Sequence, residues 1–367
     1  MRLATLLLCA ALLAGCGPAG EPEDGALRAR DLLGGTPDPA YARAREPRDF
    51  RFPADHGPHP DYQTEWWYLT GNLRDPAGGR YGFQVTFFRF ALAPAVADDS
   101  AWRTRDVWMA HFAITDVPGG QHHAAERFAR GAAGLAGARA RPLAVWLEDW
   151  RLEADPARPD HWRLVLDAGH YALSLGLRPQ KPAVLQGEAG LSQKSADPGN
   201  ASYYYSLPRL AAEGELRLGE RRLTVEGRAW MDREWSTSAL ADDQAGWDWF
   251  ALQLEDGREL MYYRLRRLDG GTDPASAGSL VAADGGYRRL EATDVGLVPL
   301  RHWQAGDGRR YPVEWQLTVN GETWRVRPVL DDQEMALSVR YWEGAVDVLD
   351  ARGEPIGMGY VELAGYD

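Results

Sequence analysis

Cysteine is scarce in this 367-residue chain, which has only Cys9 and Cys16. Both lie close to the amino terminus, so we expect no disulfide and no thiol nucleophile in the rest of the protein. Familiar catalytic motifs are also missing, since there is no Gly-rich phosphate loop, no Gly-x-Ser-x-Gly elbow and no His-Glu-x-x-His pair. Any catalytic chemistry must therefore come from other side chains.

Long hydrophobic runs are absent too. The longest amino-terminal run, Leu3 to Leu13, is shorter than the ~20 residues that a membrane-spanning helix needs. It follows Arg2 and leads into Leu13-Ala14-Gly15-Cys16, which matches the lipobox of bacterial lipoproteins. We expect residues 1–15 to be a cleaved signal peptide and Cys16 to carry several acyl chains. Because Gly17 and not Asp follows, the prediction is an exported protein, anchored in the outer membrane and facing the periplasm.

Positive charge is in deficit. The net charge is −12, and removal of residues 1–15 takes away Arg2 and no acidic residue, which leaves −13. Such a surface repels nucleic acid and anionic headgroups. We therefore expect no nucleic-acid partner, and a membrane association that depends on the lipid anchor.

Aromatic residues, in contrast, are abundant, with 15 Trp and 15 Tyr. Residues 16–48 are rich in Ala, Gly, Pro and acidic residues and predict a flexible linker. Many short β-branched and aromatic runs follow, separated by turns such as Asn320-Gly321. No segment has a convincing helical period. The sequence predicts an all-β protein of two antiparallel barrels, with domains at 49–238 and 239–367.

The candidate functional residues lie where acidic and aromatic side chains share a strand. Because neighbouring side chains on a strand alternate between faces, Trp230, Asp232 and Glu234 should share one face, as should Tyr203 and Tyr205. A carboxyl group among aromatic walls has a raised pKa and can act as an acid. The alternative is that Asp232 and Glu234 form ion pairs at a domain seam. Their partners would be Arg209, Arg233 or Arg266.

The histidines give a weaker signal. His122 and His123 lie in a predicted Gly-rich loop without metal-ligand spacing. His111 lies in an apolar strand, where a hydrogen-bonded core position is the simpler interpretation and a cavity position the alternative. We expect no metal site and no organic cofactor.

These segments also carry a family resemblance, from about Tyr62 to the carboxyl terminus. The chain resembles the AttH-like and carotenoid 1,2-hydratase (hydroxyneurosporene synthase) family, in its branch of secreted proteins named as hydrolases. The most specific motifs are Glu65-Trp66-Trp67-Tyr68, Ser202 to Arg209, Trp230-Met231-Asp232-Arg233-Glu234-Trp235, Gly246 to Phe250, Tyr341-Trp342-Glu343-Gly344 and Gly359-Tyr360-Val361-Glu362.

The resemblance implies two consecutive lipocalin-like β-barrels. It also implies an acid at Asp232, which protonates an alkene before water captures the cation. Trp230 stands where the hydratases have a Tyr, while Tyr203 and Tyr205 stand where they have a His and a Trp. With that His absent, Glu234 or a tyrosine hydroxyl would have to position water. The expected ligand-binding residues are Trp230, Trp247, Trp249, Glu65 and Trp67.

Three functions fit the sequence. The first is a lipid-anchored carrier that binds an apolar molecule, such as a lipid or polyene, in an aromatic-lined cleft. The second is a lyase or hydrolase that uses Asp232 as general acid, with Tyr203 and Tyr205 as orienting groups. The third is a structural partner of an ABC-type envelope transporter.

Overall fold

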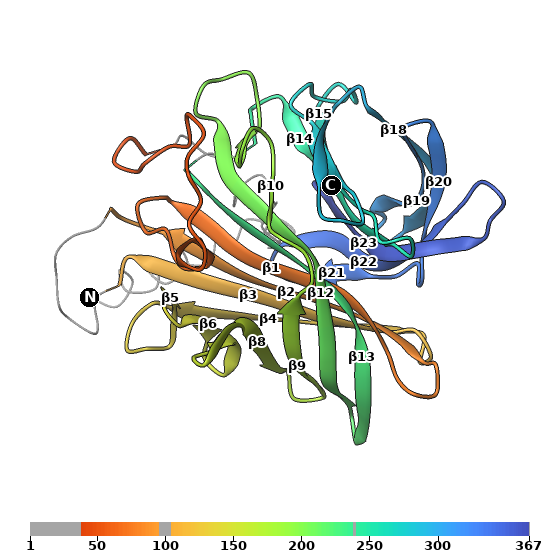
Figure 1. Ribbon diagram of the computed structural model, residues 1–367, viewed down its shortest axis with the longest axis horizontal. Helices are drawn as coiled ribbons and strands as arrows, with labels where there is room; N and C mark the ends of the chain where they lie inside the picture. Colours follow the sequence, from red (N-terminus) through yellow and green to blue (C-terminus); the bar gives the residue numbers. More distant parts are fainter. Residues whose placement is uncertain (1–37, 95–103, 238–239, 367) are drawn as a thin grey trace, which may run out of the picture.

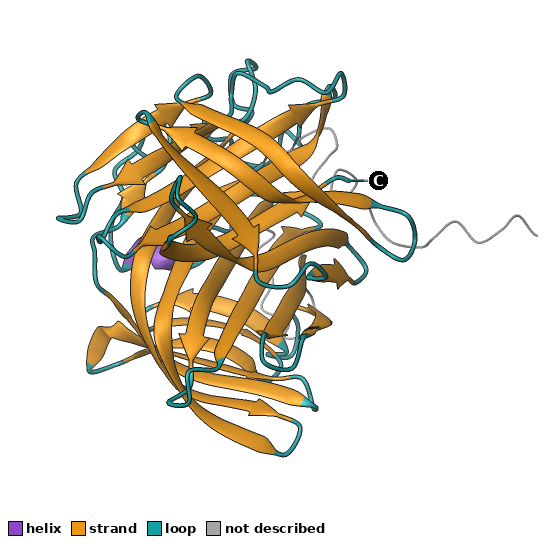
Figure 2. Ribbon diagram, turned by 90° about the vertical axis from the view of Figure 1, so that its right-hand side faces the viewer, coloured by secondary structure: helices purple, strands orange, loops and turns teal. Residues whose placement is uncertain are grey.

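The computed structural model describes residues 38–94, 104–237 and 240–366, which fold almost entirely into antiparallel strands (Figure 2). Within these ranges the one helix is the short 3-10 helix η1 (Ala54–His56), and no helix there is long and apolar enough to cross a membrane. The predicted signal peptide and lipid site at Cys16 lie outside the described residues. The all-β prediction is confirmed.

The first sheet has the strand order β4-β3-β2-β1-β13-β12-β9-β8-β7-β6-β5, and β10 and β11 also pair with β12. It curls into a barrel-like shape whose edges approach each other, since Arg127 on β4 forms an ion pair with Asp149 beside β7. Its strands are β1 (Thr64–Arg74), β2 (Arg80–Ala91), β3 (Asp106–Asp116), β4 (Gln121–Arg130), β5 (Ala136–Ala140), β6 (Leu143–Leu147), β7 (Trp150–Asp155), β8 (Arg158–Asp167), β9 (Tyr171–Pro179), β10 (Val184–Leu185), β11 (Leu191–Gln193), β12 (Ala201–Leu218) and β13 (Arg221–Ser236).

The second sheet has the order β17-β16-β15-β14-β23-β22-β20-β19-β18, and β21 pairs with β22. It curls into a second barrel beside the first (Figure 1). Its strands are β14 (Gln244–Leu254), β15 (Glu259–Arg267), β16 (Ala277–Val281), β17 (Tyr287–Glu291), β18 (Val295–Gln304), β19 (Arg310–Val319), β20 (Glu322–Pro328), β21 (Glu334–Ala336), β22 (Arg340–Leu349) and β23 (Pro355–Ala364). The two sheets divide between Ser236 and Gln244.

Each barrel has its own apolar core, and a third apolar cluster joins them. On β9 buried and more exposed residues alternate, which is the pattern of a strand with one face in water. On β1 and on the carboxyl-terminal half of β13 nearly every residue is buried, because one face packs inside the first barrel and the other against the second. These doubly buried strands place side chains at the interface between the barrels.

The last residues of the predicted linker contact the first barrel. Tyr41 and Ala44 are buried, and Nε of Arg43 donates a hydrogen bond to the carbonyl oxygen of Gly199 at 3.2 Å.

Candidate functional site between the barrels

A cavity of about 170 Å³ lies between the two barrels, at the interface formed by their facing strands. It is lined mainly by aromatic and aliphatic side chains, with four carboxyl groups, one histidine and one lysine among them. The lining residues are Trp66, Tyr68, Thr86, Phe88, Met109, His111, Lys194, Ser202, Tyr204, Asp232, Glu234, Ser236, Leu240, Trp247, Trp249, Tyr263, Leu265, Val339, Tyr341, Glu343, Glu362 and Ala364.

Strand register builds the wall that the first barrel contributes. Tyr68 on β1 lies directly opposite Asp232 on β13, and Asp232 lies opposite Ser206 on β12. Directly opposite residues point to the same face of a sheet, with their Cβ atoms about 5 Å apart. The next row of the same face is Trp66, Glu234 and Tyr204.

The second barrel contributes an equivalent wall. Trp249 on β14 lies opposite Glu362 on β23, and Glu362 lies opposite Glu343 on β22. Trp247 and Tyr341 flank Ala364 in the neighbouring row. Two glutamates that face each other across a strand pair repel when both are charged, so this register disfavours ionisation of at least one of them.

Asp232 is the most completely hydrogen-bonded of the four carboxyl groups. Its Oδ1 accepts hydrogen bonds from the Ser206 hydroxyl and from Nε1 of Trp230, both at 2.6 Å, and its Oδ2 accepts one from the Tyr204 hydroxyl at 2.5 Å. Gln186 donates to Ser206 at 2.8 Å, and Trp249 donates to Tyr204 at 3.2 Å. The donors hold the carboxyl group in one orientation at the cavity wall.

Burial raises the pKa of Asp232 to about 7, against these three donors, which lower it. When Asp232 is ionised, its carboxylate accepts all three of these hydrogen bonds, and Ser206 and Tyr204 each accept one in turn. When Asp232 is protonated, the network needs no donor from it, so its proton is free to be given to a ligand. A carboxyl group balanced between the two states near neutral pH can give up and recover a proton.

The other acids differ in environment. Glu234 forms an ion pair with Lys194, whose Nζ lies 3.0 Å from Oε1 and sits over the ring of Tyr263. Oε1 of Glu362 accepts a hydrogen bond from Nε1 of Trp247 at 3.1 Å, and burial raises the pKa of Glu362 to about 7. Oε1 of Glu343 accepts one from the Tyr68 hydroxyl at 2.5 Å. Among the described residues, no group of three or more His, Cys, Asp or Glu side chains is arranged to hold a metal ion.

The structure answers the question that the sequence left open about Asp232 and Glu234. Arg233 pairs with Glu65, Arg209 with Glu259, and Arg266 with Asp248. Asp232 has hydroxyl and indole partners and no arginine partner among the described residues, while Glu234 pairs with a lysine. Neither acid is part of an arginine seam, and the predicted shared face of Trp230, Asp232 and Glu234 is the one turned toward the second barrel.

Two of the predicted site tyrosines lie elsewhere. Tyr203 and Tyr205 share a face, as expected, but it points into the core of the first barrel, away from Asp232. The Tyr203 hydroxyl donates to the carbonyl oxygen of Glu46, and the Tyr205 hydroxyl lies 2.6 Å from Nδ1 of His56. The residue between them, Tyr204, is the one that contacts Asp232. The prediction selected the wrong face of β12.

Glu65 and Trp67 are displaced from the cavity in the same way, and Trp66 and Tyr68 take their places. Glu65 is completely buried inside the first barrel, where it pairs with Arg89 and Arg233. Although burial opposes ionisation, the two guanidinium groups hold the pKa of Glu65 far below its usual range. Arg233 in turn lies 3.7 Å from the ring centre of Trp67. Both residues lie inside the first barrel, and neither lines the cavity.

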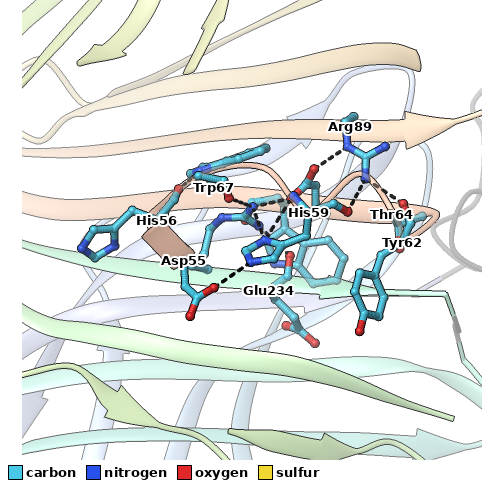
Figure 3. Close-up of polar contacts among 12 residues, drawn as sticks. Asp55, His56, His59, Tyr62, Thr64, Trp67, Arg89 and Glu234 are labelled. Atoms are coloured by element: carbon cyan, nitrogen blue, oxygen red, sulfur yellow. Dashed lines mark hydrogen bonds and ion pairs between the residues drawn. The ribbon is translucent and has the colours of Figure 1, made fainter. Parts of the chain in front are cut away.

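Nearby, His59 joins this network to the segment before β1. Its Nε2 lies 3.2 Å from Oδ1 of Asp55, and its ring stacks on Trp235 with centres 3.6 Å apart (Figure 3). Of the remaining histidines, His122 and His123 lie on β4 and not in a loop. His111 takes the cavity position that was the alternative, with Nδ1 2.7 Å from the Tyr341 hydroxyl, and burial lowers its pKa to about 3.

Several polar residues of the cavity were not among the predicted site residues, including Tyr204, Lys194, Glu343 and Glu362. The two glutamates do lie in segments that were singled out for the family resemblance. The pairing of β22 with β23, which makes them neighbours, could not be derived from those segments separately.

Comparison with known proteins shows which family has this fold. The AttH-like family model matches residues 43–366. A crystal structure of a Nitrosomonas europaea protein assigned to AttH is 34% identical, has a TM-score of 0.79, and is matched over 89% of this chain and 100% of its own. Kievitone hydratase from Nectria haematococca is 16% identical, with a TM-score of 0.65, over 89% of this chain and 96% of its own.

A third structure, CghA with Sch210972, is 15% identical, with a TM-score of 0.51, over 94% of this chain and 98% of its own. At these identities, kievitone hydratase and CghA show a shared fold only. No curated protein sequence matches the chain at a significant level. Because the family model and the Nitrosomonas europaea structure both extend over most of its length, this chain belongs to the AttH-like family.

Proposed function

We propose that this protein binds the unsaturated end of a small, mainly apolar molecule between its barrels and transfers a proton to it from Asp232, in a hydration of the carbon–carbon double bond. The observation that carries the proposal is a buried carboxyl group, protonated up to about pH 7, at the wall of an aromatic cavity. A neutral carboxylic acid in an apolar site is the usual proton donor to a weakly basic group.

The reaction balances within the cavity. Asp232 gives its proton to one alkene carbon, and the π electrons form the new C–H bond. The other carbon becomes a tertiary cation, water adds to it, and the proton that this water loses returns to the Asp232 carboxylate. The faces of Trp66, Trp247 and Trp249 can each stabilise the cation by roughly 0.5–2 kcal/mol.

The size of the cavity limits what enters it. An apolar cavity of about 150 Å³ can bind benzene, so 170 Å³ admits a small ligand or one end of a longer one. A long polyene such as an acyclic carotenoid would place only its terminal unit here, and kievitone hydratase, which shares the fold, carries a hydratase name.

The test uses 6-methylhept-5-en-2-one, whose terminal isoprenoid unit fits this size, in ¹⁸O-labelled water. We expect labelled 6-hydroxy-6-methylheptan-2-one, detected by gas chromatography and mass spectrometry. Asp232→Asn should lower the rate at least ~100-fold, the usual contribution of a general acid. The matched control is Asp242→Asn, since Asp242 is exposed beyond the end of β13. Turnover by the Asp232→Asn protein at the wild-type rate would refute the proposal.

A carrier function is the second candidate, and the apolar lining of the cavity favours it. A carrier would hold its ligand between the barrels, because side chains fill the core of each barrel. Native mass spectrometry of freshly purified protein distinguishes the two. A carrier should retain a hydrophobic molecule and give no hydration product, with Asp232→Asn leaving the retained mass unchanged.

We also propose that the protein is exported and held at the cell envelope by lipid on Cys16. The support is the lipobox Leu13-Ala14-Gly15-Cys16 of the sequence. Cys16→Ser should move the protein from the membrane fraction to the soluble fraction in a Triton X-114 partition. Unchanged partition of this variant would rule out the anchor.

A further inference from the structure

A second acid–phenol pair lies at the cavity, and the proton transfer proposed above does not use it. Glu343 comes from the second barrel and Tyr68 from the first, and Oε1 of Glu343 and the Tyr68 hydroxyl are 2.5 Å apart. Both side chains line the cavity and both are buried. The other oxygen of Glu343, Oε2, is buried and makes no hydrogen bond to any described residue.

The hydrogen-bond partners of Glu343 differ sharply from those of Asp232. Three donors satisfy the Asp232 carboxylate, whereas Glu343 accepts a hydrogen bond from Tyr68 and lies near a second hydroxyl group, that of Tyr341. Glu362, directly across the strand pair, adds repulsion to the cost of burial. Burial and this neighbour raise the pKa of Glu343 well above its ordinary value. Because Glu343 is buried and lies opposite a second carboxyl group, its protonated form is favoured.

The Glu343–Tyr68 pair lacks an acceptor for one of its O–H groups. The neutral Glu343 carboxyl group and the Tyr68 hydroxyl together carry two O–H protons, but they share a single hydrogen bond. Whichever group donates in that bond, one O–H donor is left over. A buried donor without an acceptor is costly, by about 1–3 kcal/mol, and native proteins rarely leave one unpaired. An acceptor oxygen in the cavity would remove this cost.

We propose that the Glu343–Tyr68 pair binds an oxygen atom of the ligand, so that the substrate class is an oxygenated isoprenoid-type molecule and not a pure hydrocarbon. The ligand oxygen accepts the surplus hydrogen bond at one side of the cavity, while its double bond lies toward Asp232, which is directly opposite Tyr68 in the strand register. Glu343 is thus a specificity-determining residue. This inference rests on the proposed function for the position of the double bond.

The experiment compares two ligands that differ only in the acceptor. They are 6-methylhept-5-en-2-one and 2,6-dimethylhepta-1,5-diene, in which a CH₂ group replaces the ketone oxygen. Quenching of tryptophan fluorescence gives the two dissociation constants. The ratio of the two dissociation constants is first corrected for the different free energies of transfer of the two ligands from water to hexane. After this correction we expect wild-type protein to bind the ketone about tenfold more tightly, which is the effect of one buried hydrogen bond.

Two variants separate the donor from the shape. Glu343→Gln keeps an acceptor for Tyr68 and an N–H donor for the ligand, so it should retain the preference within about threefold. Glu343→Met has a similar length and no donor, and its preference should fall to about one. Glu291→Met, at an exposed glutamate of β17, is the matched control and should behave as wild type. Equal preferences in wild type and Glu343→Met would overturn the inference.

A spectroscopic measurement needs no variant and decides the matter if Glu343→Met does not fold. The carbonyl stretch of ¹³C-labelled ketone shifts to lower frequency when the oxygen accepts a hydrogen bond. Bound to wild-type protein it should lie below its position in hexane, and a band at the hexane position would overturn the inference.

Binding in the Asp232→Asn background separates this inference from the proposed function. A retained ketone preference without turnover supports both. Turnover that depends on Asp232 but shows no ketone preference would overturn the role of Glu343 alone. A ketone preference combined with turnover that does not need Asp232 would overturn the proposed function and leave the acceptor site standing.

Discussion

Asp232→Asn should change how the free energy of unfolding depends on pH, because asparagine does not titrate. Burial raises the pKa of Asp232 from an ordinary value of 3.8 to about 7. Between these two values the folded protein holds a proton that the unfolded chain has released. Wild-type protein therefore loses stability from this group as the pH rises from about 4 to about 7, and its full contribution is present only below that window.

The size of the effect follows from the shift. Each pH unit inside the window is worth up to about 1.4 kcal/mol. Between pH 5 and pH 7 the stability of the variant relative to wild type should therefore rise by about 2 kcal/mol and then level off above pH 7. Asparagine can still accept from Ser206 and Trp230, so we expect the variant to fold. Urea unfolding curves at pH 5, 6, 7 and 8 give the measurement.

Taking the difference between variant and wild type removes most of the contribution from other groups. Glu343 and Glu362 are present in both proteins, and what changes is the interaction of Asp232 with its charged neighbours Glu362, Glu234 and Lys194. Asp242→Asn, at an exposed carboxyl group, should give a difference that does not vary with pH. If Asp232→Asn also gives a constant difference from pH 5 to pH 8, Asp232 is not held neutral by its surroundings, and the argument for an acid at this position fails.

Two further predictions test the placement of side chains. Tyr204→Phe removes a donor to the Asp232 carboxylate and should move its ¹³C NMR titration midpoint to higher pH, whereas Tyr203→Phe, on the opposite face, should leave it unchanged; equal shifts would contradict the assigned faces. Glu65→Gln leaves two buried arginines without their shared carboxylate and should cost about 3–5 kcal/mol in urea unfolding. The exposed Glu226→Gln on the same sheet should cost less than about 0.5 kcal/mol, and similar losses for both would contradict a buried network.

The position of the candidate site between the barrels depends on strand pairing more than on any single motif. Alternation along β13 correctly grouped Trp230, Asp232 and Glu234, because the period of a strand is a local property. The same rule grouped Tyr203 with Tyr205, which was also correct. The rule could not predict whether Tyr203 and Tyr205 lie on the same face of the sheet as Asp232. That depends on which residues of β12 and β13 lie opposite each other.

A shift of one residue in the choice of face exchanges every side chain of a strand between core and interface. That is why Glu65 and Trp67 proved to be core residues while Trp66 and Tyr68 line the cavity. The alternating pattern gave no warning, because β1 is buried on both faces and each face carries a tryptophan.

The sequence by itself determined the all-β class, the two barrels and the membership of Asp232 in a set of acidic and aromatic residues, because turns, strand period and motifs are local. Only the tertiary structure decided that Glu343 and Glu362, more than a hundred residues further along, join Asp232 at one cavity. It also decided that burial raises the pKa of Asp232, Glu343 and Glu362 there. Desolvation and charge repulsion depend on what surrounds a group in space, and two of these acids acquire their neighbours only when the barrels pack together.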